Sequence, residues 1–177
     1  LANKIDNYLI RWRFQRNSEH KDTLAFAGYE KSTYLINMDF PRFGTGEGKA
    51  ALNQTVRGYD IYILCDVFNY GVTYKMYGMT VPMSPDEHFA NLKRAISAIE
   101  GKAKRVSVIM PMLYEGRQHK RSSRESLDCA MMLQELHNMG VENFITFDAH
   151  DPRVMNAIPL CGFESISPAY QMIKAAV

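Results

Sequence analysis

A cluster of basic side chains is the first feature of the sequence that can do chemistry. Residues 117–125 contain a single acid and four fixed positive charges, which are Arg117, Lys120, Arg121 and Arg124. An arginine holds phosphate oxygens through two parallel hydrogen bonds, whereas a lysine acts as a point charge. A predicted helix follows the cluster, and a helix N-terminus favours anions through its free N–H groups and its dipole. The segment is therefore a candidate phosphate clamp, with a solvated charge run and a nucleic-acid contact as the alternatives.

An acid and an imidazole form the second candidate site. Asp148 and His150 come directly after a predicted strand that ends at Phe147. Mg²⁺ usually takes only one or two protein ligands and completes its shell with water and phosphate oxygens. The pair is therefore a candidate magnesium site. The alternative is a capped turn, in which the carboxylate of Asp148 accepts hydrogen bonds from backbone N–H groups.

A glycine-rich turn is the third candidate. Residues 42–48 contain Gly44, Gly46 and Gly48. Such a turn can hold a phosphate, but a lone glycine-rich segment can equally serve only to reverse the chain. Phe43 lies within this turn, where its ring either stacks on a base or packs in the core.

The candidate residues lie between elements that hydrophobic periodicity predicts. Strands are predicted at 34–38, 60–66, 105–110 and 143–147, and helices at 5–12, 84–101, 127–139 and from Ser167 to the end. Polar or irregular sequence predicts loops at 16–23, 67–83 and 112–123. From residue 60 onward this order predicts an α/β fold, a parallel sheet flanked by helices that form right-handed crossovers. Ligands of such sheets bind beyond the carboxyl ends of the strands, where the first two candidate sites fall.

The clearest helix start is the sequence Ser84-Pro85-Asp86-Glu87. Ser84 can cap the first turn, a proline suits that turn, and Glu87 can complete a capping box. We therefore expect a helix that begins directly after Ser84 and ends at Gly101.

Composition places the chain among ordinary globular proteins. Its 177 residues, 46% of them hydrophobic, suit a single domain with a sizeable core. The formal net charge of only +2 argues against a nucleic-acid partner. No stretch approaches the ~20 apolar residues that span a bilayer. Charged residues interrupt the first part of the chain, which argues against a signal peptide.

Cysteine usage points to a reducing compartment. Cys65 and Cys129 lie in apolar patterns that predict buried free thiols, which is typical of a cytoplasmic protein. Four histidines lack any partner pattern and are expected at the surface, namely His20, His88, His119 and His137.

Several motifs, in this order, resemble those of the ribose-phosphate diphosphokinase (PRPP synthetase) family. They are Phe43-Gly44-Thr45-Gly46-Glu47, Thr55-Val56-Arg57-Gly58-Tyr59-Asp60, Arg117-Gln118-His119-Lys120-Arg121 with Ser123-Arg124-Glu125, and Asp148-Ala149-His150-Asp151. The resemblance extends from about residue 34 to the end and implies the phosphoribosyltransferase-like N-terminal domain of that family. The family transfers the diphosphate of ATP to ribose 5-phosphate, which gives PRPP and AMP.

The resemblance also implies roles for the candidate residues. It implies that ATP is contacted by Phe43, Gly46, Glu47, Arg117 and Gln118. The residues of the glycine-rich turn would reach ATP that is bound mainly by a neighbouring subunit. The magnesium site would consist of Asp148 and His150, and the candidates for a further phosphate clamp are Lys120, Arg121 and Arg124. The resemblance implies a homo-oligomer, often a hexamer in this family.

Departures from the family pattern indicate a divergent branch. The family has an acid where Thr45 stands in the turn, and another where His119 stands in the basic loop. The predicted loop at 67–83 is also longer than usual. These differences leave a second hypothesis, a non-catalytic regulatory homologue of the enzyme.

The chain is expected to hold only part of the family's protein. We predict a single N-terminal domain at residues 1–177, with the start of the chain missing and residues 160–177 leading into a second domain. The family's ribose 5-phosphate site, an acidic pair before a Thr/Gly-rich turn, does not occur here. We therefore expect this chain to contain no catalytic residue, to reach ribose 5-phosphate only through the missing half, and to be inactive alone.

Overall fold

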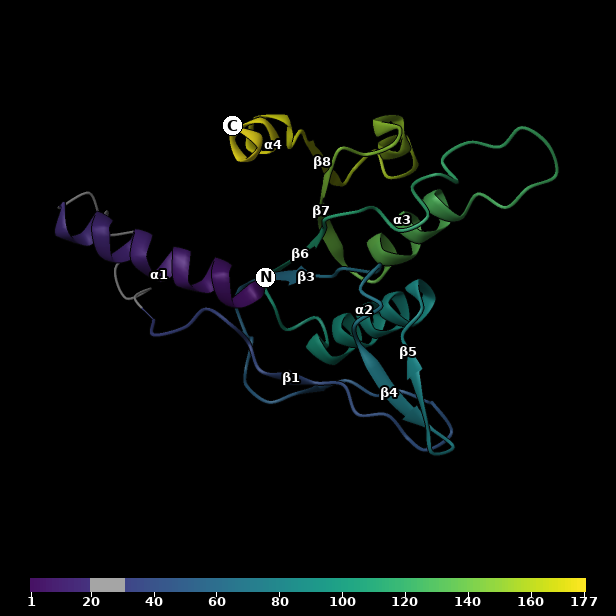
Figure 1. Ribbon diagram of the computed structural model, residues 1–177, viewed down its shortest axis with the longest axis horizontal. Helices are drawn as coiled ribbons and strands as arrows, with labels where there is room; N and C mark the ends of the chain where they lie inside the picture. The colour runs from purple at the N-terminus through teal and green to yellow at the C-terminus, as the bar shows by residue number, and fades with distance from the viewer. Residues whose placement is uncertain (20–30) are drawn as a thin grey trace. The chain divides into compact units, whose positions relative to one another are not determined.

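The described residues form two compact units. The computed structural model describes residues 1–19 and 31–177 (Figure 1). These divide into the units Leu1–Asn37 and Met38–Val177. All three candidate sites belong to the second unit.

The first unit is built on one helix, α1 (Ala2–Ser18). The buried carboxylate of Asp6 accepts a hydrogen bond from the backbone N–H of Tyr34 at 2.6 Å. The helix predicted at the start of the chain is therefore confirmed. The loop predicted from Arg16 is wrong for its first residues, because the helix continues through them. Residues 20–23 of that loop, His20 included, lie outside the described residues.

A parallel sheet forms the centre of the second unit. Its strands are β3 (Asp60–Leu64), β6 (Arg105–Met110), β7 (Val141–Phe147) and β8 (Gly162–Ile166), in the order β3-β6-β7-β8. Every neighbouring pair is parallel, so the carboxyl ends lie at one edge. The predicted α/β class is confirmed. The sequence pattern does not predict β8, because this edge strand is mostly exposed and lacks an apolar run.

Helices α2 (Pro85–Ile99) and α3 (Asp128–Asn138) flank this sheet (Figure 1). Each turns an apolar stripe inward, which consists of Phe89, Leu92, Ala95, Ile96 and Ile99 in α2 and of Cys129, Met132, Leu133 and Leu136 in α3. An ion pair of 2.8 Å between Lys93 and Glu135 joins the two helices side by side. Both predicted helices are confirmed, with slightly shorter bounds than expected.

The first turn of α2 is closed by the predicted capping box. Ser84 Oγ accepts a hydrogen bond from the backbone N–H of Glu87 at 3.3 Å. The carboxylate of Glu87 accepts one from the backbone N–H of Ser84 at 2.8 Å. Two N–H groups that the helix itself cannot bond are therefore satisfied.

Replacing Ser84 with alanine is expected to lower the free energy of unfolding by about 1 kcal/mol, within a range of roughly 0.5–2 kcal/mol. The reason is that the N–H of Glu87 loses its side-chain acceptor. Urea unfolding followed by circular dichroism measures the loss. The control is Ser97→Ala, at an exposed position of the same helix. Equal losses in the two variants would show that the cap contributes nothing.

Two short antiparallel hairpins complete the strands. They are β1 (Met38–Asp39) with β2 (Ala51–Leu52), and β4 (Thr73–Met76) with β5 (Met79–Pro82). The strand predicted at 34–38 therefore forms only at its last residue, and the loop predicted at 67–83 is wrong over the β4–β5 hairpin. Its turn is made by Tyr77 and Gly78, with φ of 48° and 81°. Positive φ at both positions suits a hairpin, but this pair lacks the Asn-Gly signal that usually reveals one.

A short 3₁₀ helix, η2 (Pro152–Ala157), follows β7, and α4 (Ala169–Ala176) follows β8. The last predicted helix is thus confirmed, although no residue of α4 is buried. Among the helices of the described ranges, none combines the length and the apolar character that crossing a bilayer requires.

Cys65, Cys129 and Cys161 are free thiols, which the sequence predicts for the first two; the predicted full burial is confirmed for Cys129 but wrong for Cys65. Cys129 is fully buried, whereas Cys65 is only half-buried. Burial is the main cause that raises the pKa of each of these two thiols to about 11. Both therefore stay protonated near neutral pH, which makes them poor nucleophiles.

Candidate functional site

A pocket opens at the carboxyl edge of the sheet. Its volume is about 880 Å³. Its polar lining includes Glu115, Arg117, Gln118, Asp148 and His150, and its apolar lining includes Phe68, Met112, Phe147 and Met172. The loop after β6 and the turn after β7 thus bring the arginine, the amide, the carboxylate and the imidazole of the sequence analysis to one place.

The apolar lining is the part of this pocket that sequence reasoning misses. Phe68 follows β3, Met112 follows β6, and Phe147 ends β7. Their position at the carboxyl end of a strand of a parallel sheet, or shortly after it, is the one signal that marks them. An apolar residue at such a position can belong to the hydrophobic core or to a binding pocket, so the residue type alone does not distinguish the two.

The turn after β7 has an unusual backbone. Asp148 has φ of 48°, in the left-handed region that few residues other than glycine adopt. Its N–H donates to the carbonyl of Ile166 at 3.0 Å, and the N–H of Ala149 donates to Ser165 Oγ at 2.9 Å. Strand β8 therefore holds this turn. Residues kept in such conformations cluster at functional sites.

The carboxylate of Asp148 accepts no hydrogen bond from another described residue. The capped turn that stood as the alternative is formed instead by Asp151, which begins η2. Asp151 Oδ1 accepts from the backbone N–H of Arg153 at 2.9 Å. The hydrogen bonds from Arg153 are the main cause that holds the pKa of Asp151 well below its usual range. Asp148 and Asp151 thus divide the two roles considered for the turn, since the first lines the pocket and the second caps.

The prediction that His119 lies at the surface is wrong. Its side chain is only 11% exposed, and its Nε2 lies 3.5 Å from Asp151 Oδ2. Its ring meets the ring of His150 edge-on, with 5.0 Å between the centroids. Its Nδ1 is buried without a partner among the described residues. Through these contacts His119 holds the loop after β6 against the turn after β7. The spacing of residues in the sequence does not predict such a contact.

Arg117 is exposed and makes no hydrogen bond or ion pair with another described residue, although it lines the pocket. Its charge acts on Glu115. Burial first, and then the charges of Asp128 and Asp86, raise the pKa of Glu115, while Arg117 opposes this shift.

The rest of the basic cluster lies elsewhere. Lys120, Arg121 and Arg124 are exposed and do not line the pocket. Figure 1 shows the segment between β6 and α3 as a long excursion without regular structure. The basic run also ends before α3 begins at Asp128, so the expected contribution of a helix N-terminus to this cluster is not observed.

The glycine-rich turn also lies outside the pocket. Phe43, Gly46 and Glu47 are absent from its lining. The ring of Phe43 is 58% exposed, so the alternative that it packs in the core is wrong. The exposed carboxylate of Glu47 accepts a hydrogen bond from Thr45 Oγ1 at 2.9 Å. The turn therefore presents an aromatic ring and an acid to the outside.

The residues present fit Mg²⁺ better than a transition metal. Across residues 1–19 and 31–177 there is no group of three His, Cys, Asp or Glu side chains that could hold a metal ion. A structural transition-metal site needs such a group. Asp148 and His150 offer two ligands on one turn, and Mg²⁺ accepts so few when phosphate oxygens supply the others.

Several known proteins are similar to this chain. The family model of the N-terminal domain of ribose phosphate pyrophosphokinase matches residues 1–140. The ribose-phosphate pyrophosphokinase of Corynebacterium ammoniagenes is 24% identical over 115 residues, which are 64% of this chain and 32% of that protein. That of Oceanobacillus iheyensis is 25% identical over 124 residues, which are 69% and 35%. The chain thus spans about a third of the length of these curated relatives.

A solved structure shares the fold. The phosphoribosylpyrophosphate synthetase from Mycobacterium smegmatis superposes with a TM-score of 0.66 at 17% identity, over 80% of this chain and 43% of that chain. At this identity the likeness speaks for the fold alone. The family model, in contrast, covers well over half of the sequence. The chain therefore belongs to the family of the N-terminal domain of ribose phosphate pyrophosphokinase.

Proposed function

We propose that this chain is the ATP-binding half of a ribose-phosphate diphosphokinase, which transfers the diphosphate of ATP to ribose 5-phosphate. The observation that carries the proposal is one shared pocket. Arg117, Gln118, Asp148 and His150 come from two separate loops and line the same cavity. The family of the chain supports the class of reaction.

The pocket offers ATP a polar end and an apolar end. At the polar end, the guanidinium of Arg117 can hold two phosphate oxygens at once, and Gln118 adds an amide donor. Asp148 and His150 would hold Mg²⁺, which when bound neutralises negative charge on the phosphates. At the other end, apolar side chains such as Phe68 can shield the bound nucleotide from water.

The proposed reaction asks for little covalent chemistry from the protein. The 1-hydroxyl of ribose 5-phosphate loses its proton to solvent, and its oxygen forms a bond to the β-phosphorus of ATP. The bond from this phosphorus to the oxygen that bridges to the α-phosphate breaks, and AMP leaves. Transfers of this kind depend on positioning and on charge neutralisation. Arg117 and the Asp148–His150 pair are suited to both tasks.

Other parts of the enzyme are proposed to lie outside this chain. Residues 1–177 would form one N-terminal domain, and residues 160–177 would lead into a domain that binds ribose 5-phosphate. Phe43, Gly46 and Glu47 lie outside the pocket, so they would reach ATP only in a neighbouring subunit. We therefore propose a cytoplasmic homo-oligomer, with a hexamer as the expected size, and a chain that is inactive alone.

Binding of Mg-ATP to this chain is the direct test. Calorimetry is expected to show saturable binding that weakens by at least ~10-fold, or about 1.4 kcal/mol, when EDTA removes Mg²⁺. The reason is that Asp148 then faces the phosphates without a counter-ion. His150→Ala is expected to abolish most of this Mg²⁺ dependence. The control is His137→Ala, because His137 contacts Val141 at the opposite end of β7.

Three results would contradict parts of the proposal. Failure of the folded chain to bind Mg-ATP would refute the assignment of the pocket. AMP formation by this chain with ribose 5-phosphate would refute the placement of the acceptor site in another domain. A complete protein that binds Mg-ATP but forms no PRPP would favour the regulatory homologue.

A further inference from the structure

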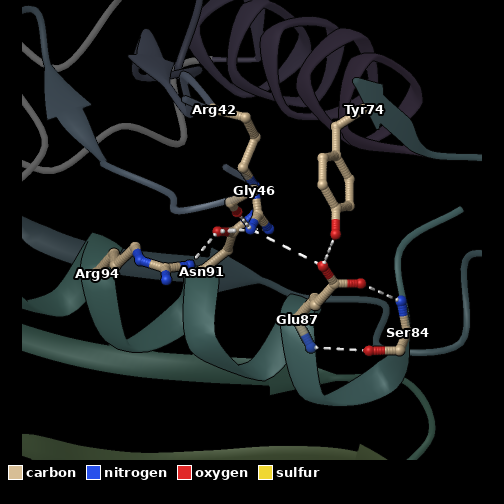
Figure 2. A network of polar contacts seen from close by, with 7 residues as sticks. All are labelled: Arg42, Gly46, Tyr74, Ser84, Glu87, Asn91 and Arg94. Carbon is tan, nitrogen blue, oxygen red and sulfur yellow. Dashed lines mark hydrogen bonds and ion pairs between the residues drawn. The ribbon is translucent and has the colours of Figure 1, made fainter. Parts of the chain in front are cut away.

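The glycine-rich turn at residues 42–48 is held by polar contacts from two other elements (Figure 2). The turn itself is closed by an isolated antiparallel β-bridge between the backbones of Arg42 and Gly48. The other side chains of the network come from β4 and from α2 with its cap, and they are Tyr74, Ser84, Glu87, Asn91 and Arg94. They do not line the pocket described above, so the proposed function leaves them without a role.

Arg42 is the centre of this network. Its side chain is only 9% exposed. Its Nη1 donates to the carbonyl of Gly46 at 2.9 Å, and its Nη2 donates to Asn91 Oδ1 at 3.3 Å. The guanidinium also lies over the ring of Tyr74, 4.6 Å from the centroid. One nearly buried cation therefore joins the turn to α2 and to β4 at once.

Glu87 supplies the negative charge of the network. Its Oε1 accepts a hydrogen bond from the hydroxyl of Tyr74 and lies 3.9 Å from Arg42 Nη1. Its Oε2 accepts the N–H of Ser84 in the capping box. Burial works to raise the pKa of Glu87, but the bonds from Tyr74 and Ser84 and the charge of Arg42 together lower it. Glu87 is therefore ionised near neutral pH and closes both the cap and the network.

The β4–β5 hairpin also touches the backbone of the turn. The N–H of Tyr77 donates to the carbonyl of Gly44 at 2.9 Å. Gly46 has φ of 93°, and a Cβ atom on it would lie 2.8 Å from Met76 Sδ. The positive φ favours glycine at position 46, and the close approach shows that the Met76 side chain packs against the turn.

We infer that the β4–β5 hairpin and the first turn of α2 form a mount for residues 42–48, with Tyr74 and Glu87 as positioning residues for Phe43 and Glu47. The effect on nucleotide binding rests on the proposed function. The mount itself rests only on the contacts given above.

The mount has a physical purpose because the turn is rich in glycine. Glycine loses more conformational freedom on ordering than any other residue, so a free turn would populate many conformations. A segment that holds its binding conformation for only part of the time binds its ligand more weakly in proportion. Fixing the turn from outside therefore favours any contact made through the exposed ring of Phe43.

Tyr74→Phe tests the mount, since it removes one hydroxyl and leaves the ring beneath Arg42. The amide hydrogens of Gly46 and Tyr77 are expected to exchange with solvent at least ~3-fold faster. In the complete enzyme, KM for ATP is expected to rise by about threefold with kcat unchanged, which a general loss of stability does not produce. The control is Tyr62→Phe, on β3, where the side chain is 61% exposed.

Glu87→Gln is the second variant. Glutamine preserves the capping box but removes the negative charge opposite Arg42. Faster amide exchange at Gly46 and Tyr77 and a higher KM for ATP are therefore expected for this variant as well. Unchanged exchange in both variants overturns the mount. Faster exchange with an unchanged KM overturns the positioning role. A failure of the unmodified chain to bind Mg-ATP refutes the proposed function alone, because the exchange measurement involves no nucleotide.

Discussion

Arg117→Ala is expected to lower kcat/KM for ATP in the complete enzyme by at least ~10-fold, or about 1.4 kcal/mol of transition-state stabilisation. The guanidinium lines the pocket and is not engaged by another described residue, so its donors are available to phosphate. Alanine removes both the charge and the paired donors. Arg117→Lys keeps the positive charge but lacks the paired, planar N–H donors of the guanidinium, so an intermediate loss is expected. Steady-state kinetics with varied Mg-ATP measures each effect.

Arg105→Ala is the matched control for this substitution. Arg105 begins β6, whereas Arg117 follows the carboxyl end of the same strand. The side chain of Arg105 is exposed, and its Nε lies 3.4 Å from Asp60 Oδ1. The change in net charge is identical, but the distance from the pocket differs. Equal losses in Arg105→Ala and Arg117→Ala would show that net charge, and not contact with ATP, is responsible.

Leu133→Ala is expected to lower the free energy of unfolding by about 2–5 kcal/mol. Leu133 is 0% exposed and belongs to the apolar stripe of α3. Alanine loses the burial of the removed carbons and leaves a cavity that close-packed neighbours fill only in part. Urea unfolding gives the change from the midpoint, with the slope as a check that the extent of unfolding is the same.

Met131→Ala serves as the comparison on the same helix. The side chain of Met131 is 60% exposed. Its removal is expected to change stability by no more than about 0.5 kcal/mol, as is usual for surface positions. If the two substitutions destabilise the chain equally, α3 does not pack with the face described here.

Local pattern is sufficient for the elements that build the core. The apolar run at 105–110 predicts β6 with the bounds that the structure has. The stripe that begins at Phe89, with the capping sequence at Ser84, predicts α2. Burial of one stripe or of one short run depends on neighbours a few positions away, so the sequence itself carries this information.

The elements that sequence reasoning misses lie at edges. β8 is mostly exposed, β4 alternates exposed with half-buried residues, and β5 is exposed except at Val81. Such strands are stabilised by pairing with a neighbouring strand, and no apolar run marks them. The hairpin matters all the same, because Tyr74 and Met76 contact the glycine-rich turn.

The chemical inventory of the site can be read from residue order alone. An arginine and an amide after one strand, and a carboxylate and an imidazole after the next, must gather near the same edge once the strands are parallel. Tertiary structure decides which of them share a cavity. Arg117 and His150 do, whereas Arg121 and Arg124, which belong to the same basic run as Arg117, do not. The reason is that the path of a loop depends on contacts with distant residues, such as that of His119 with Asp151, and periodicity does not record them.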